Sequence, residues 1–246
     1  FISRSEMTTI AHMNHKLLLF DIDATLLRTG GSGMIAMKLV AERLFGPDWE
    51  WGSINTSGSL DPVIFAEAAA INRLEDHHDH HERFRDHYID ELEKQLAANM
   101  HIFEVLPGVP ELLATLRHRA MAQRDIVLGL LTGNYTNAVP VKFKFAKLDP
   151  SWFTITAFGD EAPSRPDLVV LAMQKYLKAH GRPIDPKRVI VIGDTPRDIH
   201  CARTHGCVAF AVATGQYDAK TLREAGADFV VESFADPSPL MKLIDA

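Results

Sequence analysis

Residues 17–26 form the stretch LLLFDIDATL, in which an apolar run as long as a buried strand ends in two carboxylates, Asp21 and Asp23. In an extended chain, residues two apart point to the same side and lie about 6 to 7 Å from each other. Both carboxylates can therefore face one bound group and one cation. The alternative is a strand-end turn that carries two solvated acids, and the rest of the chain must separate the two interpretations.

Composition limits the possible functions of the chain. Its 246 residues, 46% of them hydrophobic, suffice for one large domain or for a domain with an insertion. The net charge of −6, with no basic block, argues against nucleic acid as a partner. No apolar run approaches the about 20 residues of a membrane span, and no secretory leader is evident. We therefore expect a cytoplasmic protein, and the oligomeric state stays open.

The two cysteines, Cys201 and Cys207, are too few and wrongly spaced for a zinc knuckle or a disulfide framework. We expect both to be small buried apolar residues in a reducing compartment.

Hydrophobic periodicity divides the chain into a helical block and an alternating part. Apolar residues recur at helical spacing in 34–45, 61–74 and 80–96. From residue 107 onward, helical patterns alternate with short apolar runs at 126–131, 153–157, 189–192, 208–212 and 229–231. Such alternation predicts βαβ units and a parallel sheet.

The fold class predicted from this order is α/β, a doubly wound parallel sheet with an inserted α-helical cap. We assign residues 7–30 and 105–246 to the core and 31–104 to the cap, because glycines or prolines interrupt the periodicity near 30–33 and 103–108. The cap should cover the carboxyl ends of the strands, where open parallel sheets bind their ligands.

A glycine cluster and a histidine cluster stand out in the sequence, and we expect both to have structural rather than chemical roles. The glycine cluster at 30–33 lacks the lysine of a P-loop and the full dinucleotide spacing, so we expect a hinge or flap there. The histidines at 77, 78, 80 and 81 lie among acidic residues on a predicted helix, where adjacent side chains diverge. We expect an exposed polar helix start there, and no metal site.

Two further loops add groups that bind phosphate. The run 126–131 ends at Thr132-Gly133-Asn134, where a hydroxyl and an accessible backbone amide precede a helix expected to begin near Tyr135. A simple helix cap and turn explains this triplet equally well. Arg165 precedes another amphipathic helix and could neutralise an oxyanion, although alone it is no more than a surface arginine.

The last strand-end motif, in 189–198, supplies two more acids. Asp194 follows a β-branched strand, Pro196 begins a helix, and Asp198 on its first turn faces back toward the strand ends. Capping alone could explain Asp198. Together with the first pair, these acids form an oxygen-rich cluster of the kind that Mg²⁺ prefers, often completed by a substrate phosphate.

The combined motifs resemble those of the haloacid dehalogenase (HAD) superfamily, specifically its phosphatase branch with an α-helical cap, similar to phosphoglycolate phosphatases. The resemblance covers nearly the whole chain from Lys16 and implies a Rossmann-like core. The family's motifs are matched by Asp21, Asp23 and Thr25, by Thr132, and by Gly193, Asp194 and Asp198.

Two positions depart from the family pattern. Arg165 stands where the family usually has a lysine, which keeps the charge and changes its geometry. Ala24 stands where glycine is most common, which restricts the backbone of the loop. Both departures leave the turnover rate open.

The resemblance implies a hydrolase that releases phosphate from a small phosphorylated metabolite. Asp21 would form an aspartyl-phosphate, and Asp23 would protonate the leaving alcohol and then activate water. Thr132 and Arg165 would complete the catalytic set, and phosphate would be bound by Thr132, Gly133, Asn134 and Arg165.

The resemblance also implies a metal cofactor. Mg²⁺ would be held by Asp21, the backbone carbonyl of Asp23, and Asp194. Asp198 would act from outside this set by orienting Arg165 or a water of the metal. The loop 58–61 resembles the substrate-facing loop of such caps, so Asp61 becomes a candidate substrate ligand, unless it simply begins a helix.

Three alternatives remain. A haloacid dehalogenase is disfavoured, since those members lack the acid at the position of Asp23. A phosphomutase of the same capped type would need a cap lysine or arginine, and the sequence offers no obvious one. A non-catalytic binding module would explain Ala24 and Arg165 as signs of decay. No residue selects among small phosphates, of which phosphoglycolate-like compounds are one possibility.

Overall fold

The computed structural model of the protein describes residues 15–75 and 77–246, so the predicted start of the core at residue 7 lies outside the described residues. Its main sheet has six strands in the order β5-β4-β1-β6-β7-β8, and every neighbouring pair is parallel. The strands are β1 (Lys16–Phe20), β4 (Ile126–Leu131), β5 (Ile155–Ala157), β6 (Val189–Gly193), β7 (Val208–Val212) and β8 (Phe229–Val231). The predicted α/β fold class is confirmed.

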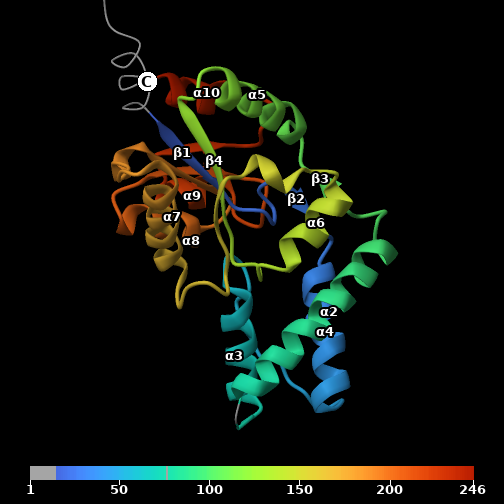
Figure 1. Cartoon of the computed structure of the whole chain (residues 1–246). Helices are drawn as coiled ribbons and strands as arrows, with labels where there is room; N and C mark the ends of the chain where they lie inside the picture. Colours follow the sequence, from blue (N-terminus) through green and yellow to red (C-terminus); the bar gives the residue numbers. More distant parts are fainter. Residues whose placement is uncertain (1–14, 76) are drawn as a thin grey trace, which may run out of the picture.

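Strand β1 lies in the middle of the sheet because its side chains are apolar on both faces. Leu18 and Phe20 pack into the cluster on one face, and Leu17 and Leu19 into the cluster on the other. One face is covered by α5 (Val109–Ala122), α6 (Ala138–Ala146) and α10 (Ser238–Asp245), and the other by α7 (Arg165–His180), α8 (Pro196–Thr204) and α9 (Ala219–Glu224). Figure 1 shows α5 and α10 on the opposite side of β1 from α7 and α8.

The helical block forms a separate layer beyond the sheet. It consists of α2 (Ser32–Phe45), α3 (Asp61–Ile71) and α4 (His77–Ala98), which extend away from the strands in Figure 1. These helices bury their own apolar cluster, which Tyr135 and Ala138 of the core join. A short antiparallel pair, β2 (Leu27–Arg28) with β3 (Glu104–Val105), lies where the chain enters and leaves this block. The residue boundaries of the two domains stay a prediction.

Two predicted element boundaries are wrong. The helix expected near Tyr135 begins at Ala138, and in the turn before it the backbone N–H groups of Tyr135 and Thr136 donate to the carboxylates of Asp61 and Asp160. The run 153–157 becomes a strand only at Ile155, after the 3₁₀ turn η1 (Pro150–Trp152). A second 3₁₀ turn, η2 (Pro186–Arg188), precedes β6.

The histidine cluster is less exposed than predicted. His78 is exposed, whereas the His81 ring stacks on Phe65 with 5.0 Å between centroids. His81 Nε2 lies 2.8 Å from the Tyr135 hydroxyl, and burial lowers the pKa of this histidine. The prediction of an exposed polar helix start is therefore wrong for His81, because its ring links the cap to the core. The side chain of His77 lies outside the described part of the chain.

The predicted burial of the two cysteines is confirmed. Cys201 and Cys207 are both buried free thiols, and burial raises the pKa of each to about 12. Across the described ranges, no helix combines the length and the apolar character that crossing a bilayer requires.

Candidate active site

Three polar side chains follow three neighbouring strands at one edge of the sheet. Asp21, Thr132 and Asp194 come directly after β1, β4 and β6, and parallel strands place their carboxyl ends together. The Asp21 N–H donates to the carbonyl of Ile192 at 2.8 Å, which extends the strand pairing to the first catalytic candidate. A cavity of about 570 Å³ opens at this edge, and its lining includes all three residues.

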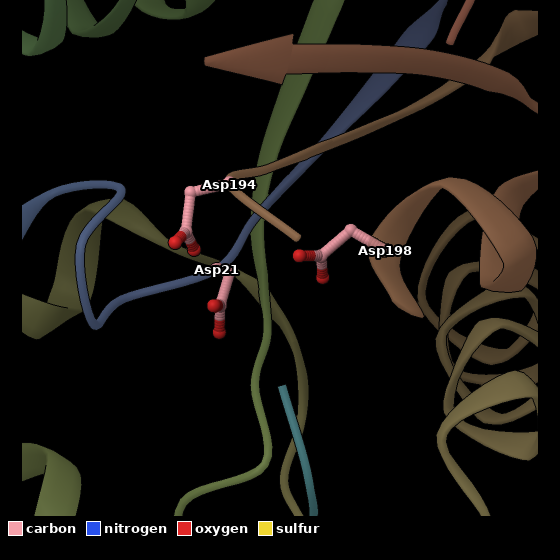
Figure 2. A group of neighbouring side chains, drawn as sticks. All are labelled: Asp21, Asp194 and Asp198. Atoms are coloured by element: carbon pink, nitrogen blue, oxygen red, sulfur yellow. The ribbon is translucent and has the colours of Figure 1, made fainter. Parts of the chain in front are cut away.

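Three of the four acids predicted to meet form a cluster, whereas the Asp23 carboxylate pairs with Lys142 instead. Ligand oxygens of Asp21, Asp194 and Asp198 all lie within 4.8 Å of one another, and all three residues are buried. Figure 2 shows their carboxyl groups converging from two strand ends and from helix α8. Gly215 makes room for the group, since a Cβ there would lie 1.8 Å from Asp194 Oδ2.

Asp198 differs from the other two because both of its oxygens already accept hydrogen bonds. Its Oδ2 accepts from the backbone N–H and the hydroxyl of Thr195, at 3.0 and 2.7 Å, in a capping box. Its Oδ1 accepts from Arg165 Nε and Nη2, at 3.1 and 2.5 Å. Asp21 and Asp194 are therefore better placed to hold a cation, and Asp198 holds Arg165.

Burial makes this group of carboxylates electrostatically unfavourable when no metal ion is bound. Burial raises the pKa of Asp21 to about 6, while nearby Arg165 acts in the opposite direction. Burial, followed by the charges of Asp198 and Asp21, raises the pKa of Asp194 to about 8. The site has more negative carboxylates than positive side chains, and carboxylate oxygens are the ligands that a hard divalent cation prefers. The residues present thus fit a metal ion.

These raised pKa values predict how the stability of metal-free protein depends on pH. The folded state retains protons that the unfolded state, with aspartate pKa values near 3.8, has released, so the free energy of unfolding falls as pH rises. The contribution of Asp21 is lost by about pH 6, and that of Asp194 is lost by about pH 8, so in chelator the melting temperature should still decrease between these two pH values. Mg²⁺ should raise it more at the upper pH. A melting temperature that stays constant over this window in chelator, or that Mg²⁺ raises equally at both pH values, would contradict the account.

Arg165 is buried at the first residue of α7 and joins the acids to the cap. Its Nη2 lies 3.2 Å from Asp21 Oδ1, and its Nη1 donates to the Gly58 carbonyl at 3.0 Å. The guanidinium also points toward Gly133, because a Cβ at Gly133 would lie 3.2 Å from Nη1. The structure therefore places a fixed positive charge between Asp21 and the loop that follows β4.

Lys142 is a site residue that the sequence analysis missed. Its ammonium group donates to Asp23 Oδ1 and Oδ2 at 2.7 and 2.6 Å, and also to Asn134 Oδ1. Asn134 Nδ2 donates to Asp23 Oδ2 and to Thr132 Oγ1, both at 2.7 Å. In the sequence, the available signal was a lysine between apolar neighbours in the helix that follows Thr132-Gly133-Asn134. In the structure, Lys142 is only 3% exposed.

Ala24 adopts the backbone conformation for which the family pattern uses glycine. Its φ is 56°, in the left-handed region. A side chain there costs about 1 kcal/mol relative to glycine. The Ala24 N–H donates to the Leu27 carbonyl at 2.7 Å, and the Ala24 carbonyl accepts from Thr214 Oγ1 at 2.5 Å. The loop accommodates alanine, and Asp21 and Asp23 both keep their places in the cavity lining.

The cap loop 58–61 lies directly on the loop after β4. The Asp61 N–H donates to the Gly133 carbonyl at 2.7 Å, and Asp61 Oδ2 accepts from the Tyr135 N–H at 3.0 Å. A Cβ at Gly133 would lie 1.9 Å from the Ser59 carbonyl oxygen, so this contact requires glycine. Gly58, Ser59 and Asp61 all line the same cavity as Asp21.

Comparison with known families assigns the chain. The family model described as haloacid dehalogenase-like hydrolase matches residues 18–203, well over half of the sequence. The chain belongs to this family. The resemblance inferred from the motifs is therefore confirmed, and the matched range includes every strand-end motif described above.

Curated relatives of this HAD-like chain have one name in common. A phosphoglycolate phosphatase of Synechococcus elongatus is 28% identical over 156 residues, 63% of this chain and 66% of that protein. One of Chromobacterium violaceum is 30% identical over 162 residues, 65% of this chain and 62% of that protein. The matched part of the chain thus spans less than two thirds of the length of each relative.

A solved structure supports the HAD-like fold over almost the whole chain. A hydrolase from Pseudomonas syringae superposes with a TM-score of 0.68 at 23% identity, covering 92% of this chain and 98% of that chain. At this identity the likeness concerns the fold alone. The arrangement of strands and helices is therefore common to the two structures.

Proposed function

We propose that this protein is a Mg²⁺-dependent phosphomonoester hydrolase that acts on a small organic phosphate through an aspartyl-phosphate on Asp21. The observation that carries the proposal is that Asp21, with Arg165 beside it, and a second carboxylate, Asp23, line the same cavity of about 570 Å³. One carboxylate can attack phosphorus while the other moves protons. A cavity of this size suits a small metabolite.

The reaction has two displacements at phosphorus. An Asp21 oxygen attacks the phosphorus, the bond to the alcohol oxygen breaks, and Asp23 gives that oxygen a proton. Asp23, now a carboxylate, takes a proton from water as the water attacks the aspartyl-phosphate, which releases inorganic phosphate and regenerates Asp21. Lys142 and Asn134 hold the Asp23 side chain in position for both steps.

The phosphate oxygens would meet donors from two segments, the loop after β4 and the first residue of α7. The Thr132 hydroxyl, the backbone N–H groups of Gly133 and Asn134, and the Arg165 guanidinium would supply hydrogen bonds and positive charge to the transferring group. The Asp21 and Asp194 carboxylates and the Asp23 carbonyl would hold Mg²⁺, which offsets the repulsion between the nucleophile and the phosphate. Asp198 positions Arg165 through its two hydrogen bonds.

The alternatives receive less support. Dehalogenation at carbon has no use for a proton donor at the position of Asp23. A phosphomutase needs a cation for a second phosphate, and within the described residues no lysine or arginine of α2, α3 or α4 lines the cavity. Two relatives are named phosphoglycolate phosphatase, so phosphoglycolate is the first ester to assay.

Metal dependence tests the proposal. Purified protein should release inorganic phosphate from small esters in the presence of Mg²⁺, lose this activity in chelator, and regain it when Mg²⁺ is restored. The reason is that the three buried carboxylates of the cluster lie around one guanidinium, that of Arg165, which leaves an excess of negative charge where the phosphate must bind. Phosphate release would be measured across a panel of esters in both conditions. Turnover that chelator leaves unchanged would contradict the metal-dependent mechanism.

A further inference from the structure

The wall of the cavity formed by the cap has its own chemistry. We call it the cap wall and define it as Met34, Met37, Asp61, Ile64 and Tyr88, all of which line the cavity. Met37, Ile64 and Tyr88 are almost completely buried in the apolar cluster of the cap. These five side chains offer a carboxyl group and a phenol, and the adjoining cap loop adds the hydroxyl groups of Thr56, Ser57 and Ser59 to the cavity lining. A leaving group in contact with the cap therefore meets an acid, hydroxyl groups and apolar carbons, and no cation of the described cap residues.

Asp61 has one oxygen available for a ligand. Its Oδ2 accepts from the Tyr135 N–H, whereas no donor to Oδ1 is found among the residues that the structure describes. Burial raises the pKa of Asp61 to about 7, and Lys142 only partly offsets this effect. Above that pH the side chain is ionised and its Oδ1 lacks a donor among the described residues, and a hydroxyl group of a ligand can supply one.

The cations that line the cavity are already engaged. In the described part of the chain these are Arg28, Lys142 and Arg165. Arg28 pairs with Glu104 and donates to the Thr214 carbonyl at 2.6 Å. Lys142 pairs with Asp23, and Arg165 with Asp198 and Asp21.

A carboxylate on the leaving group would thus face Asp61 with no cation of the cap wall to neutralise it. Like charges placed next to each other in a poorly hydrated site cost several kcal/mol. A hydroxyl group in the same place would satisfy Asp61 Oδ1. The cavity therefore distinguishes a leaving group that carries a hydroxyl from one of the same carbon skeleton that carries a carboxylate.

We propose that the substrate is the phosphate ester of an uncharged, hydroxyl-bearing alcohol such as a short polyol, and that Asp61 selects against esters whose leaving group carries a carboxylate. This inference rests on the proposed phosphomonoesterase function. It concerns the cavity of this chain. It predicts a substrate preference that differs from phosphoglycolate, the ester in the names of the two curated relatives.

Two matched pairs of esters test the inference. Glycerol 3-phosphate and 3-phosphoglycerate differ only in a terminal hydroxymethyl or carboxylate group, and 2-hydroxyethyl phosphate and phosphoglycolate differ in the same way. We expect kcat/KM to favour the hydroxyl member of each pair by about tenfold or more at about pH 8, where Asp61 is ionised. The ratios are measured by phosphate release with Mg²⁺ present.

The Asp61→Asn variant identifies the selecting group. Asparagine retains an oxygen for the Tyr135 N–H and removes the charge, so both ratios should fall toward one through faster hydrolysis of the carboxylate members. Glu67→Gln is the matched control, since Glu67 is an exposed acid on the same helix, α3, and does not belong to the cavity lining. The control should keep the wild-type ratios.

The outcomes separate this inference from the function on which it rests. Hydrolysis with a preference for the carboxylate members, or ratios that Asp61→Asn leaves unchanged, would overturn the inference and leave the phosphomonoesterase proposal intact. Failure to hydrolyse any of the four esters or p-nitrophenyl phosphate would overturn both. Because the wild-type ratios alone decide the first point, the test does not depend on the variant folding.

Discussion

Replacing Asp21 by asparagine is expected to abolish phosphate release, with kcat falling by about 10⁴-fold or more. An amide has nearly the same shape as the carboxylate and is a very poor nucleophile, so the phosphoryl group cannot be transferred to residue 21. Initial rates of phosphate release for Asp21→Asn and wild-type protein, both saturated with Mg²⁺, measure the effect.

Folding should not explain this loss. Burial raises the pKa of Asp21, so an uncharged side chain suits the position and the metal-free variant should melt at or above the temperature of metal-free wild-type protein. Asp90→Asn, at an exposed position on α4, is the matched control and should retain wild-type kcat. If Asp21→Asn retains more than a few per cent of wild-type turnover, Asp21 is not the nucleophile.

Replacing Asp23 by asparagine is expected to lower the turnover of alkyl phosphates by about 10² to 10⁴-fold, because both proton transfers lose their catalyst. Asp23 is held by Lys142 and Asn134 at 2.6 to 2.7 Å, and asparagine can accept one of these hydrogen bonds, so the site geometry should persist. Steady-state rates with glycerol 3-phosphate measure the loss.

An ester with a good leaving group separates the two roles of Asp23. The p-nitrophenolate ion leaves without a proton, so Asp23→Asn protein should form the aspartyl-phosphate at close to the wild-type rate and then hydrolyse it slowly. Stopped-flow absorbance should show a burst of nitrophenol equal to the enzyme concentration. Slow nitrophenol release without a burst would mean that Asp23 supports the nucleophilic step itself, and the proton-transfer role would be wrong.

Sequence alone predicted the sheet and the acid cluster because both depend on short-range patterns. The apolar run before Asp21 predicts a buried strand, and the β-branched run before Asp194 predicts a second strand of the same sheet. Parallel strands end at one edge, so acids at these ends must lie close together. The cluster of Asp21, Asp194 and Asp198 follows from that rule.

Lys142 could not be placed in the same way. Its place in the site depends on the pairing of its ammonium group with Asp23, which precedes it by 119 residues. This contact between distant segments buries a lysine of helix α6 that would otherwise face solvent. Local propensity contains no information about such a contact, so Lys142 was predicted only as a helical residue.

His81 illustrates the same limit on the cap side. Polar neighbours on α4 predicted exposure, yet the ring packs on Phe65 and reaches the Tyr135 hydroxyl, which is a contact across the interface of cap and core. Ala24 shows the opposite case. The family pattern identified a position that needs glycine-like freedom, and the φ of 56° is the physical reason.

Trapping the covalent intermediate tests the central claim most directly. Asp23→Asn protein, mixed with p-nitrophenyl phosphate and Mg²⁺ and quenched into borohydride, should contain residue 21 as homoserine, because borohydride reduces an acyl phosphate to the alcohol. Mass spectrometry of the peptide that contains residues 17–26 should find this change only when both the ester and Mg²⁺ were present. If the ester is hydrolysed while residue 21 is recovered only as aspartate, catalysis does not proceed through an aspartyl-phosphate on Asp21.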